Sequence, residues 1–216
     1  MKMLFFDMEF ANGKVPGSIY SLGYLMTDEN FDIIRGPADI LMNPDSEWNE
    51  YVKSHILAYP KETVEAAPKF PMLYQSLCAL FDEADIAVGF AVNNDIRALR
   101  KNCERYGLEQ IRFRALDMEK LCRKQEEYKE AHGLGGYVNA WCGEIPDNRH
   151  RSDGDALATM MLFRAICQAK HATAEMMLTV YPECCTSSLA VAKKVQKTPS
   201  KKKAGRVRRK KADSRT

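Results

Sequence analysis

The stretch at residues 3–10, MLFFDMEF, is an apolar run of the kind that forms a core strand, and two acids interrupt it. Successive side chains of a strand point to opposite faces, so Asp7 and Glu9, two residues apart, share one face. Burying two like charges side by side is costly unless protons or a cation neutralise them. A divalent cation with oxygen ligands is one such neutraliser. The stretch therefore predicts a first strand that carries a metal site.

Further strands and helices follow this strand along the chain. Two β-branched and aromatic runs, at 19–26 and 31–35, predict a hairpin beside the first strand. We expect further strands at 86–90 and 111–116, and helices near 47–55, 71–81, 95–106, 118–128, 134–141 and 152–169. Strands that first meander and then alternate with helices are typical of a mixed α/β sheet with helices packed on it.

Composition indicates an ordinary folded domain with reduced thiols. At 216 residues and 45% hydrophobic content, the chain can bury a full core. No apolar run reaches the length of a membrane span, and the first apolar run is broken by Asp7, so we expect neither a membrane segment nor a secretion signal. The seven cysteines are scattered without a C-x-x-C pair, which favours free thiols in a cytoplasmic protein over disulfides or zinc.

The net charge of +3 is divided unevenly along the chain. Residues 193–216 hold twelve Lys and Arg and one Asp, a net charge of +11, so the preceding residues carry −8. Because this tail has almost no apolar content, we expect it to be disordered. It is suited to nonspecific contacts with nucleic-acid phosphates, and the alternative is a solvated tail without a specific partner.

Two more acids and a histidine stand where an α/β sheet could bring them to the first strand. Asp95 begins the helix after the strand at 86–90, and Asp155 lies in the first turn of the last long helix. His150, five residues before Asp155, is by itself most often a surface histidine. Together, four carboxylates that hold two divalent ions and a histidine that takes a proton from water predict a phosphodiester hydrolase.

Each of these acids also has a purely local explanation. Asp95 could complement the dipole of its helix, with Asn93 or Asn94 as the cap. Ser152 and Asp155 have the spacing of a capping box, with Asp in place of the usual Glu.

Three motifs, FFDMEF, GFAVNND and HRSDGDALAT, resemble the three exonuclease motifs of the DEDD 3′-to-5′ exonuclease superfamily. The match is to the branch marked by a histidine five residues before the last Asp, which includes the epsilon subunit of bacterial DNA polymerase III and ribonuclease T. It extends from about residue 1 to about residue 168 and leaves the tail outside. The resemblance implies a single domain with a ribonuclease-H-like mixed sheet of five strands, the first three of them antiparallel, flanked by helices. We accordingly expect an exonuclease domain at 1–175, a linker or terminal helix at 176–192 and the basic tail beyond.

Site residues follow from the resemblance position by position. It implies that Asp7, Glu9, Asp95 and Asp155 bind two ions, Mg²⁺ or Mn²⁺, and that His150 is the general base. Glu9 and the backbone near Phe10 would hold the 3′-terminal nucleotide.

Departures from the family pattern fall at the substrate rather than at the metals. Phe10 stands where many relatives have Thr, and Asn94 stands where many have Phe. Phe90 and Ala91 replace a common His-Asn pair, and Ser152 replaces a common Ala. We therefore include Phe10 and Asn94 among the predicted substrate-binding residues.

The sequence thus predicts a metal-dependent exonuclease that releases nucleoside monophosphates from single-stranded 3′ ends of DNA or RNA. A second hypothesis is a weakly active nucleic-acid-binding module that presents the basic tail. A third, an endonuclease of the ribonuclease H type, is disfavoured by the histidine spacing. DNA and RNA are not distinguished, because one sequence does not indicate which side chains meet the 2′-hydroxyl.

Overall fold

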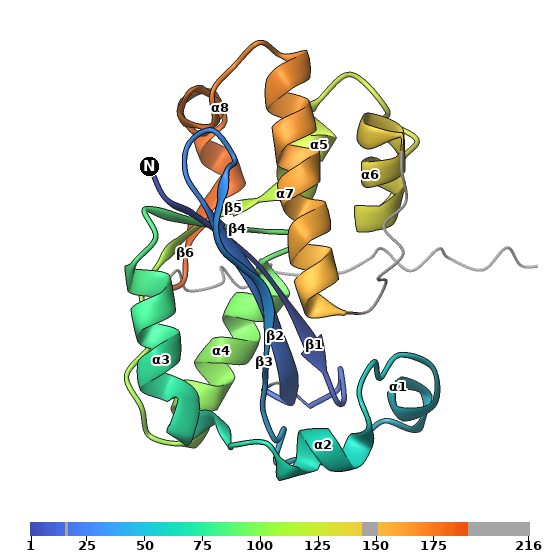
Figure 1. The fold of residues 1–216 in the computed structure, drawn as a ribbon, viewed down its shortest axis with the longest axis vertical. Coiled ribbons are helices and arrows are strands. Elements are labelled where there is room, and N and C mark those ends of the chain that lie inside the picture. Colours follow the sequence, from blue (N-terminus) through green and yellow to red (C-terminus); the bar gives the residue numbers. More distant parts are fainter. Residues whose placement is uncertain (16, 144–150, 190–216) are drawn as a thin grey trace, which may run out of the picture.

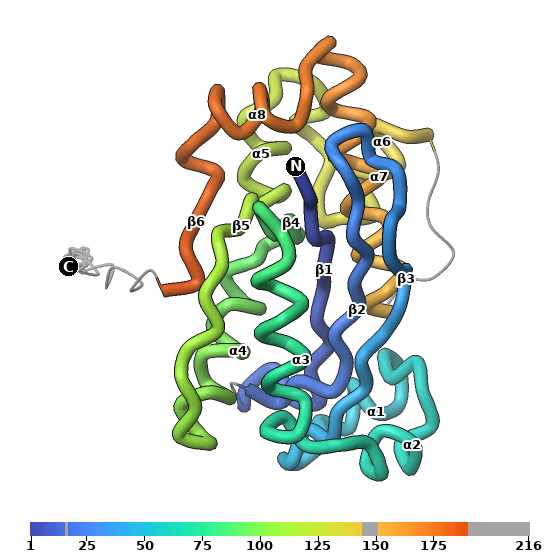
Figure 2. Tube along the Cα trace, turned by 60° about the vertical axis from the view of Figure 1, so that its left-hand side comes forward, coloured from blue at the N-terminus to red at the C-terminus, as the bar shows by residue number. Residues whose placement is uncertain are grey.

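The computed structural model describes residues 1–15, 17–143 and 151–189. Strand β1 (Met3–Phe10) has the bounds predicted from its apolar run. Strands β2 (Ile19–Thr27) and β3 (Ile33–Leu41) continue from it as antiparallel neighbours, and β4 (Ile86–Gly89) and β5 (Arg114–Asp117) extend the sheet in parallel on its other side. Figure 2 shows the resulting order, β3-β2-β1-β4-β5-β6. The mixed α/β sheet and its antiparallel first three strands confirm the predicted fold class.

Within the described residues the sheet has six strands, and the predicted number of five was wrong. The additional strand, β6 (Cys185–Ser187), pairs antiparallel with β5 and lies within the segment expected to be a linker or terminal helix. Helix α8 (Ala174–Val180) and a 3₁₀ turn (Pro182–Cys184) lead into it. Three residues are too few to show an alternating pattern, because that signal needs about four to eight residues. The pairing with β5, rather than a local sequence pattern, therefore determines that these residues form a strand.

Strand β3 is longer than predicted. The predicted strand ended at Arg35, but β3 continues past Gly36 and Pro37 to Leu41. A proline removes one ladder donor, which is tolerated here because β3 is the edge strand. The extension brings Asp39 into the sheet.

Helices cover both faces of the sheet (Figure 1). One face carries α8 and the helices α5 (Met118–Lys124), α6 (Gly133–Cys142) and α7 (Ser152–Ala169), and the other carries α3 (Phe70–Asp82) and α4 (Asn93–Arg105). Alternation along β1 separates two cores: Met3 and Phe5 pack with α7, whereas Leu4 and Phe6 pack with α3 and α4. Asp7 and Glu9 continue the series of Met3 and Phe5, so they lie on the α7 face.

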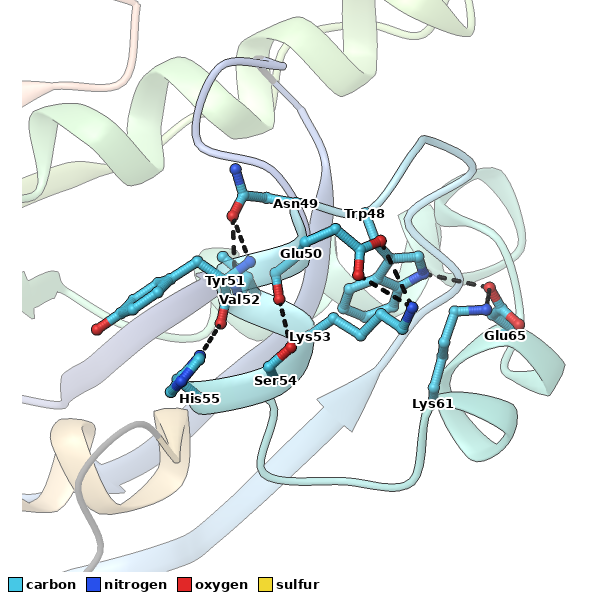
Figure 3. A network of polar contacts seen from close by, with 10 residues as sticks. All are labelled: Trp48, Asn49, Glu50, Tyr51, Val52, Lys53, Ser54, His55, Lys61 and Glu65. Carbon is cyan, nitrogen blue, oxygen red and sulfur yellow. Dashed lines mark hydrogen bonds and ion pairs between the residues drawn. The ribbon is translucent and has the colours of Figure 1, made fainter.

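Two short helices lie near the end of β1 (Figures 1 and 3). Helix α1 (Glu50–His55) falls in a region predicted to be helical, whereas α2 (Lys61–Ala66) was not predicted. Asn49 caps α1 by accepting from two backbone N–H groups of its first turn at 2.9 and 3.3 Å. Trp48 Nε1 donates to Glu65 Oε1 at 3.2 Å, which ties α2 to the start of α1.

Two expectations from composition concern membranes and thiols. Among the described helices, none is both long and apolar enough to cross a membrane. All seven cysteines lie in the described ranges, and each is a free thiol.

Candidate active site

Asp7, Glu9 and Asp155 lie together where the first turn of α7 meets β1. One carboxylate oxygen from each residue lies within 4.8 Å of one from each of the other two. The period of β1 places Asp7 and Glu9 on the face that α7 covers, and helical geometry brings in Asp155, whose backbone N–H donates to Arg151 O at 2.9 Å. Three of the four acids predicted from sequence thus form one group.

Asp95 adjoins this group from α4. It lies in the first turn of that helix and is 4% exposed. Val92 is the N-cap residue of α4 and makes no side-chain cap, so neither Asn93 nor Asn94 has the capping role considered above. After burial, the charge of Asp95 is the largest cause that raises the pKa of Asp7. Asp95 is therefore electrostatically part of the cluster, although it is not among the three acids whose oxygens meet within 4.8 Å.

Burial and, after it, the charges of neighbouring acids raise the pKa of Asp7, Glu9 and Asp95. Burial, followed by the charges of Asp155 and Asp39, raises the pKa of Glu9 to about 8. Burial and then the charge of Glu9 raise the pKa of Asp95, and the pKa of Asp7 is likewise held well above its ordinary value. The cation-free cluster therefore retains protons near neutral pH. Carboxylate oxygens in such a group fit a hard divalent cation, which would displace those protons on binding.

Asp39 is a fifth acid near the cluster, and the sequence did not predict it. It is in register with Gly23 on β2, and Gly23 is in register with Asp7. The three positions therefore form one row across the sheet. The sequence does contain a signal, because Asp39 interrupts the run ADILM as Asp7 interrupts MLFFDMEF, but the predicted strand ended before it.

Ser152 does not form the capping box that its spacing allowed. The N-cap residue of α7 is Arg151, and no side chain caps this helix. Ser152 is fully buried, and its Oγ donates to Asp39 Oδ1 at 2.8 Å. Its hydroxyl thus connects α7 to β3.

A pocket of about 270 Å³ lies between the loop after β1 and the start of α4. Two predicted substrate-binding residues, Phe10 and Asn94, line it, together with Asn12, Gly13, Val15, Gly17, Arg97 and Ala98. The third, Glu9, precedes Phe10 on β1 and belongs to the acid group. Arg97 was not predicted, since an exposed arginine one turn into a helix carries no distinguishing sequence signal.

Two predictions concern residues that the structure does not describe. His150, the predicted general base, and the basic tail at 193–216 both lie outside the described ranges. They stay predictions.

The six-stranded sheet, its two helical layers and the acid group define a ribonuclease-H-like exonuclease fold. No protein-family model matches the chain, and no curated protein matches it by sequence.

Several solved structures have a fold similar to that of this chain. The nuclease domain of 3′hExo, a DEDDh family member bound to rAMP, superposes with a TM-score of 0.65 at 11% identity over 78% of this chain and 92% of that one. A 3′-exonuclease that recognises the histone mRNA stem-loop gives 0.64 at 11% identity over 80% and 84%. E. coli Exonuclease I with a dA16 oligonucleotide gives 0.66 at 16% identity over 83% of this chain but only 42% of its own. The chain thus has the fold of the DEDDh 3′-exonucleases, which agrees with the family that its motifs resemble.

Proposed function

We propose that this chain is a metal-dependent 3′-to-5′ exonuclease that releases nucleoside monophosphates from the 3′ end of single-stranded DNA or RNA. The proposal rests above all on Asp7, Glu9 and Asp155, each of which offers one oxygen to a group that spans no more than 4.8 Å. The cluster stands in a fold shared with exonucleases, of which one was solved with rAMP and another with an oligonucleotide.

The acids would act as ligands for two divalent ions, Mg²⁺ or Mn²⁺. When bound, such ions lower the pKa of an attacking water and stabilise charge on the transferring phosphoryl group. Asp7, Glu9 and Asp95 would release their protons to bind them, since burial and repulsion hold those protons in the cation-free protein. Asp155 would be the fourth ligand. His150 would take the proton of the attacking water, for which an ordinary histidine pKa near neutrality is suited.

The pocket lined by Phe10 and Asn94 would receive the terminal nucleoside. Its volume of about 270 Å³ is close to the lower end, about 300 Å³, of ligand pockets generally, which suits one nucleoside rather than a longer segment. Phe10 offers an aromatic face, and Asn94 offers both a donor and an acceptor. Glu9, next to Phe10 on β1, would contact the terminal sugar.

Nucleic acid is the proposed partner, and the basic tail would add nonspecific phosphate contacts. This tail carries a net charge of +11 at 193–216, which favours long-range, salt-sensitive attraction to any nucleic-acid strand. We also propose a cytoplasmic location, where seven free thiols persist.

A digestion that resolves the ends of the substrate tests the activity and its polarity. Matched single-stranded DNA and RNA, a duplex and a circular single strand are incubated with Mg²⁺, with Mn²⁺ or with EDTA. The expected result is stepwise shortening from the 3′ end of linear single strands, mononucleotide products, an intact circle and no reaction in EDTA. Cleavage of the circle would show an endonuclease, and binding without hydrolysis would favour the nucleic-acid-binding module.

A further inference from the structure

Helix α7 starts unusually close to the sheet, directly over Gly23. A Cβ added at Gly23 would lie 1.8 Å from Ser152 C and 2.0 Å from Asp153 N, both backbone atoms. The missing side chain therefore leaves the space that the first turn of α7 occupies. Because Gly23 lies between Asp7 and Asp39 in the row across the sheet, this turn is placed between the two acids.

Hydroxyl groups fix the turn in that place. Ser152 Oγ donates to one oxygen of Asp39 at 2.8 Å and lies 2.5 Å from Ser21 Oγ on β2. Tyr59 OH donates to the other oxygen of Asp39. Both carboxylate oxygens of Asp39 thus accept from hydroxyls.

The residues on either side of Ser152 belong to the same network. The guanidinium of Arg151 lies 5.4 Å from the centre of the Tyr59 ring and donates to both oxygens of Asp153 at 3.1 and 2.9 Å. Tyr59 therefore contacts Asp39 through its hydroxyl and Arg151 through its ring. Side chains thus tie the start of α7 to β3 and to the segment after α1.

We propose that Asp39, Ser152 and Tyr59, the Asp39 clamp, are positioning residues that hold the first turn of α7 where Asp155 meets Asp7 and Glu9. Asp155 lies three residues after Ser152, and its N–H is bonded within this turn, so a displacement of Ser152 moves the Asp155 carboxylate with it. The clamp positions the metal centre through Asp155, and none of its three residues is proposed as a metal ligand. This inference rests on the proposed function for its catalytic consequence, but the clamp itself is a property of the fold.

Three variants test the clamp against a matched control. Ser152→Ala, Asp39→Asn and Tyr59→Phe each weaken it with little change in volume. Ser188→Ala removes a comparable buried hydroxyl, which accepts from Phe113 N at 2.9 Å beside β6, at the opposite edge of the sheet.

Metal affinity and kinetics give the first readouts. Calorimetric titration with Mn²⁺ should show weaker binding by about 10- to 100-fold in Ser152→Ala and Asp39→Asn, and a smaller loss in Tyr59→Phe, as is usual for residues that orient a metal ligand. Hydrolysis should lose kcat by a similar factor, with KM for the oligonucleotide nearly unchanged. Ser188→Ala should match the wild type in both.

Hydrogen exchange of the metal-free protein gives a readout that does not depend on activity. Amides in the first turn of α7 should exchange faster in Ser152→Ala than in the wild type or Ser188→Ala. Unchanged exchange and Mn²⁺ affinity in Ser152→Ala would overturn the clamp. Loss of Mn²⁺ affinity in Asp39→Asn alone would overturn it too, because Asp39 would then be a ligand. An inactive wild type with faster exchange in Ser152→Ala would instead sink the proposed function and leave the clamp standing.

Discussion

Asp7 and Glu9 are close enough to Asp155 for each charge to affect the others. Burial and the neighbouring charges raise the pKa of Glu9 from 4.5 to about 8, and the pKa of Asp7 is raised in the same direction. The folded, metal-free protein therefore keeps protons that the unfolded chain releases at lower pH.

The first prediction is that this protein, in EDTA, becomes less stable as pH rises from about 5 to about 8. Between the unfolded and folded pKa values of Glu9, 4.5 and about 8, the folded state binds more protons, so the free energy of unfolding falls with pH. The loss should be roughly 2 to 5 kcal/mol. Urea unfolding at stepped pH measures it. Glu9→Gln should reduce the dependence of unfolding free energy on pH, and Glu109→Gln, at an exposed acid, should not. Stability that rises with pH through this range would contradict the raised pKa of Glu9.

Arg97 adds a positive charge to the pocket, beside Phe10 and Asn94. The second prediction is that Arg97→Gln raises KM for single strands by roughly 3- to 10-fold and changes kcat little, since one phosphate or base contact is lost at a distance from the acids. The exposed Arg112, just before β5, provides the control Arg112→Gln. Steady-state kinetics at two salt concentrations decide the matter, and an unchanged KM in Arg97→Gln would remove Arg97 from the substrate site.

At the scale of elements, the site depends on the contact between β2 and the start of α7. The third prediction is that Gly23→Ala destabilises the protein by about 3 kcal/mol and displaces Asp155, because its Cβ would meet the backbone of Ser152 at 1.8 Å. Gly135→Ala is the matched control, as a Cβ there meets nothing within 4 Å. Thermal unfolding and Mn²⁺ titration of both variants measure the two effects. A Gly23→Ala protein as stable as Gly135→Ala would show that α7 can move without cost.

Helices and strands with a long sequence pattern could be predicted from the sequence. Strands that form because a neighbouring strand pairs with them could not. The run of β1 and the helical stripe of α7 are local signals, so their positions were predicted closely. Strand β6 has only three residues, which is too short for a visible pattern. The second half of β3 follows Gly36-Pro37, a pair that is typical of turns, so the predicted strand ended too early.

The residues of the candidate site likewise fall into those that the sequence could predict and those that it could not. Asp7, Glu9, Asp95 and Asp155 lie in local motifs, so the sequence indicated them. The bond from Ser152 to Asp39 joins residues 113 positions apart, and no local pattern carries it. Ser152 instead had the spacing of a capping box, because sequence shows the neighbours along the chain and not those across the sheet.

On the scale of the whole molecule, charge is separated between an acidic body and a basic tail. Residues 193–216 carry a net charge of +11 and the rest of the chain carries −8, which together give the total of +3. The acid cluster is at the site where a polyanion would be hydrolysed, so long-range attraction for the strand must come largely from elsewhere.

The fourth prediction is that truncation after residue 192 weakens binding of long single strands and makes it less salt-dependent, but leaves hydrolysis of short oligonucleotides intact. Each phosphate contact that is lost removes about one unit from the slope of log affinity against log salt. Fluorescence anisotropy at several salt concentrations, beside a digestion assay, separates the two effects. Loss of hydrolysis together with affinity would favour the binding-module hypothesis.

We propose that Asp7, Glu9 and Asp155 form the metal centre of a 3′-to-5′ exonuclease. The most direct measurement compares the rate of 3′-end shortening with saturating Mn²⁺ in the wild type, Asp7→Ala and Asp82→Ala, the last an exposed acid at the end of α3. We predict that Asp7→Ala loses more than about 100-fold in rate, since even residues that only orient a ligand cost about 10- to 100-fold, while Asp82→Ala keeps the wild-type rate. Wild-type shortening by Asp7→Ala would show that Asp7 does not hold a catalytic ion.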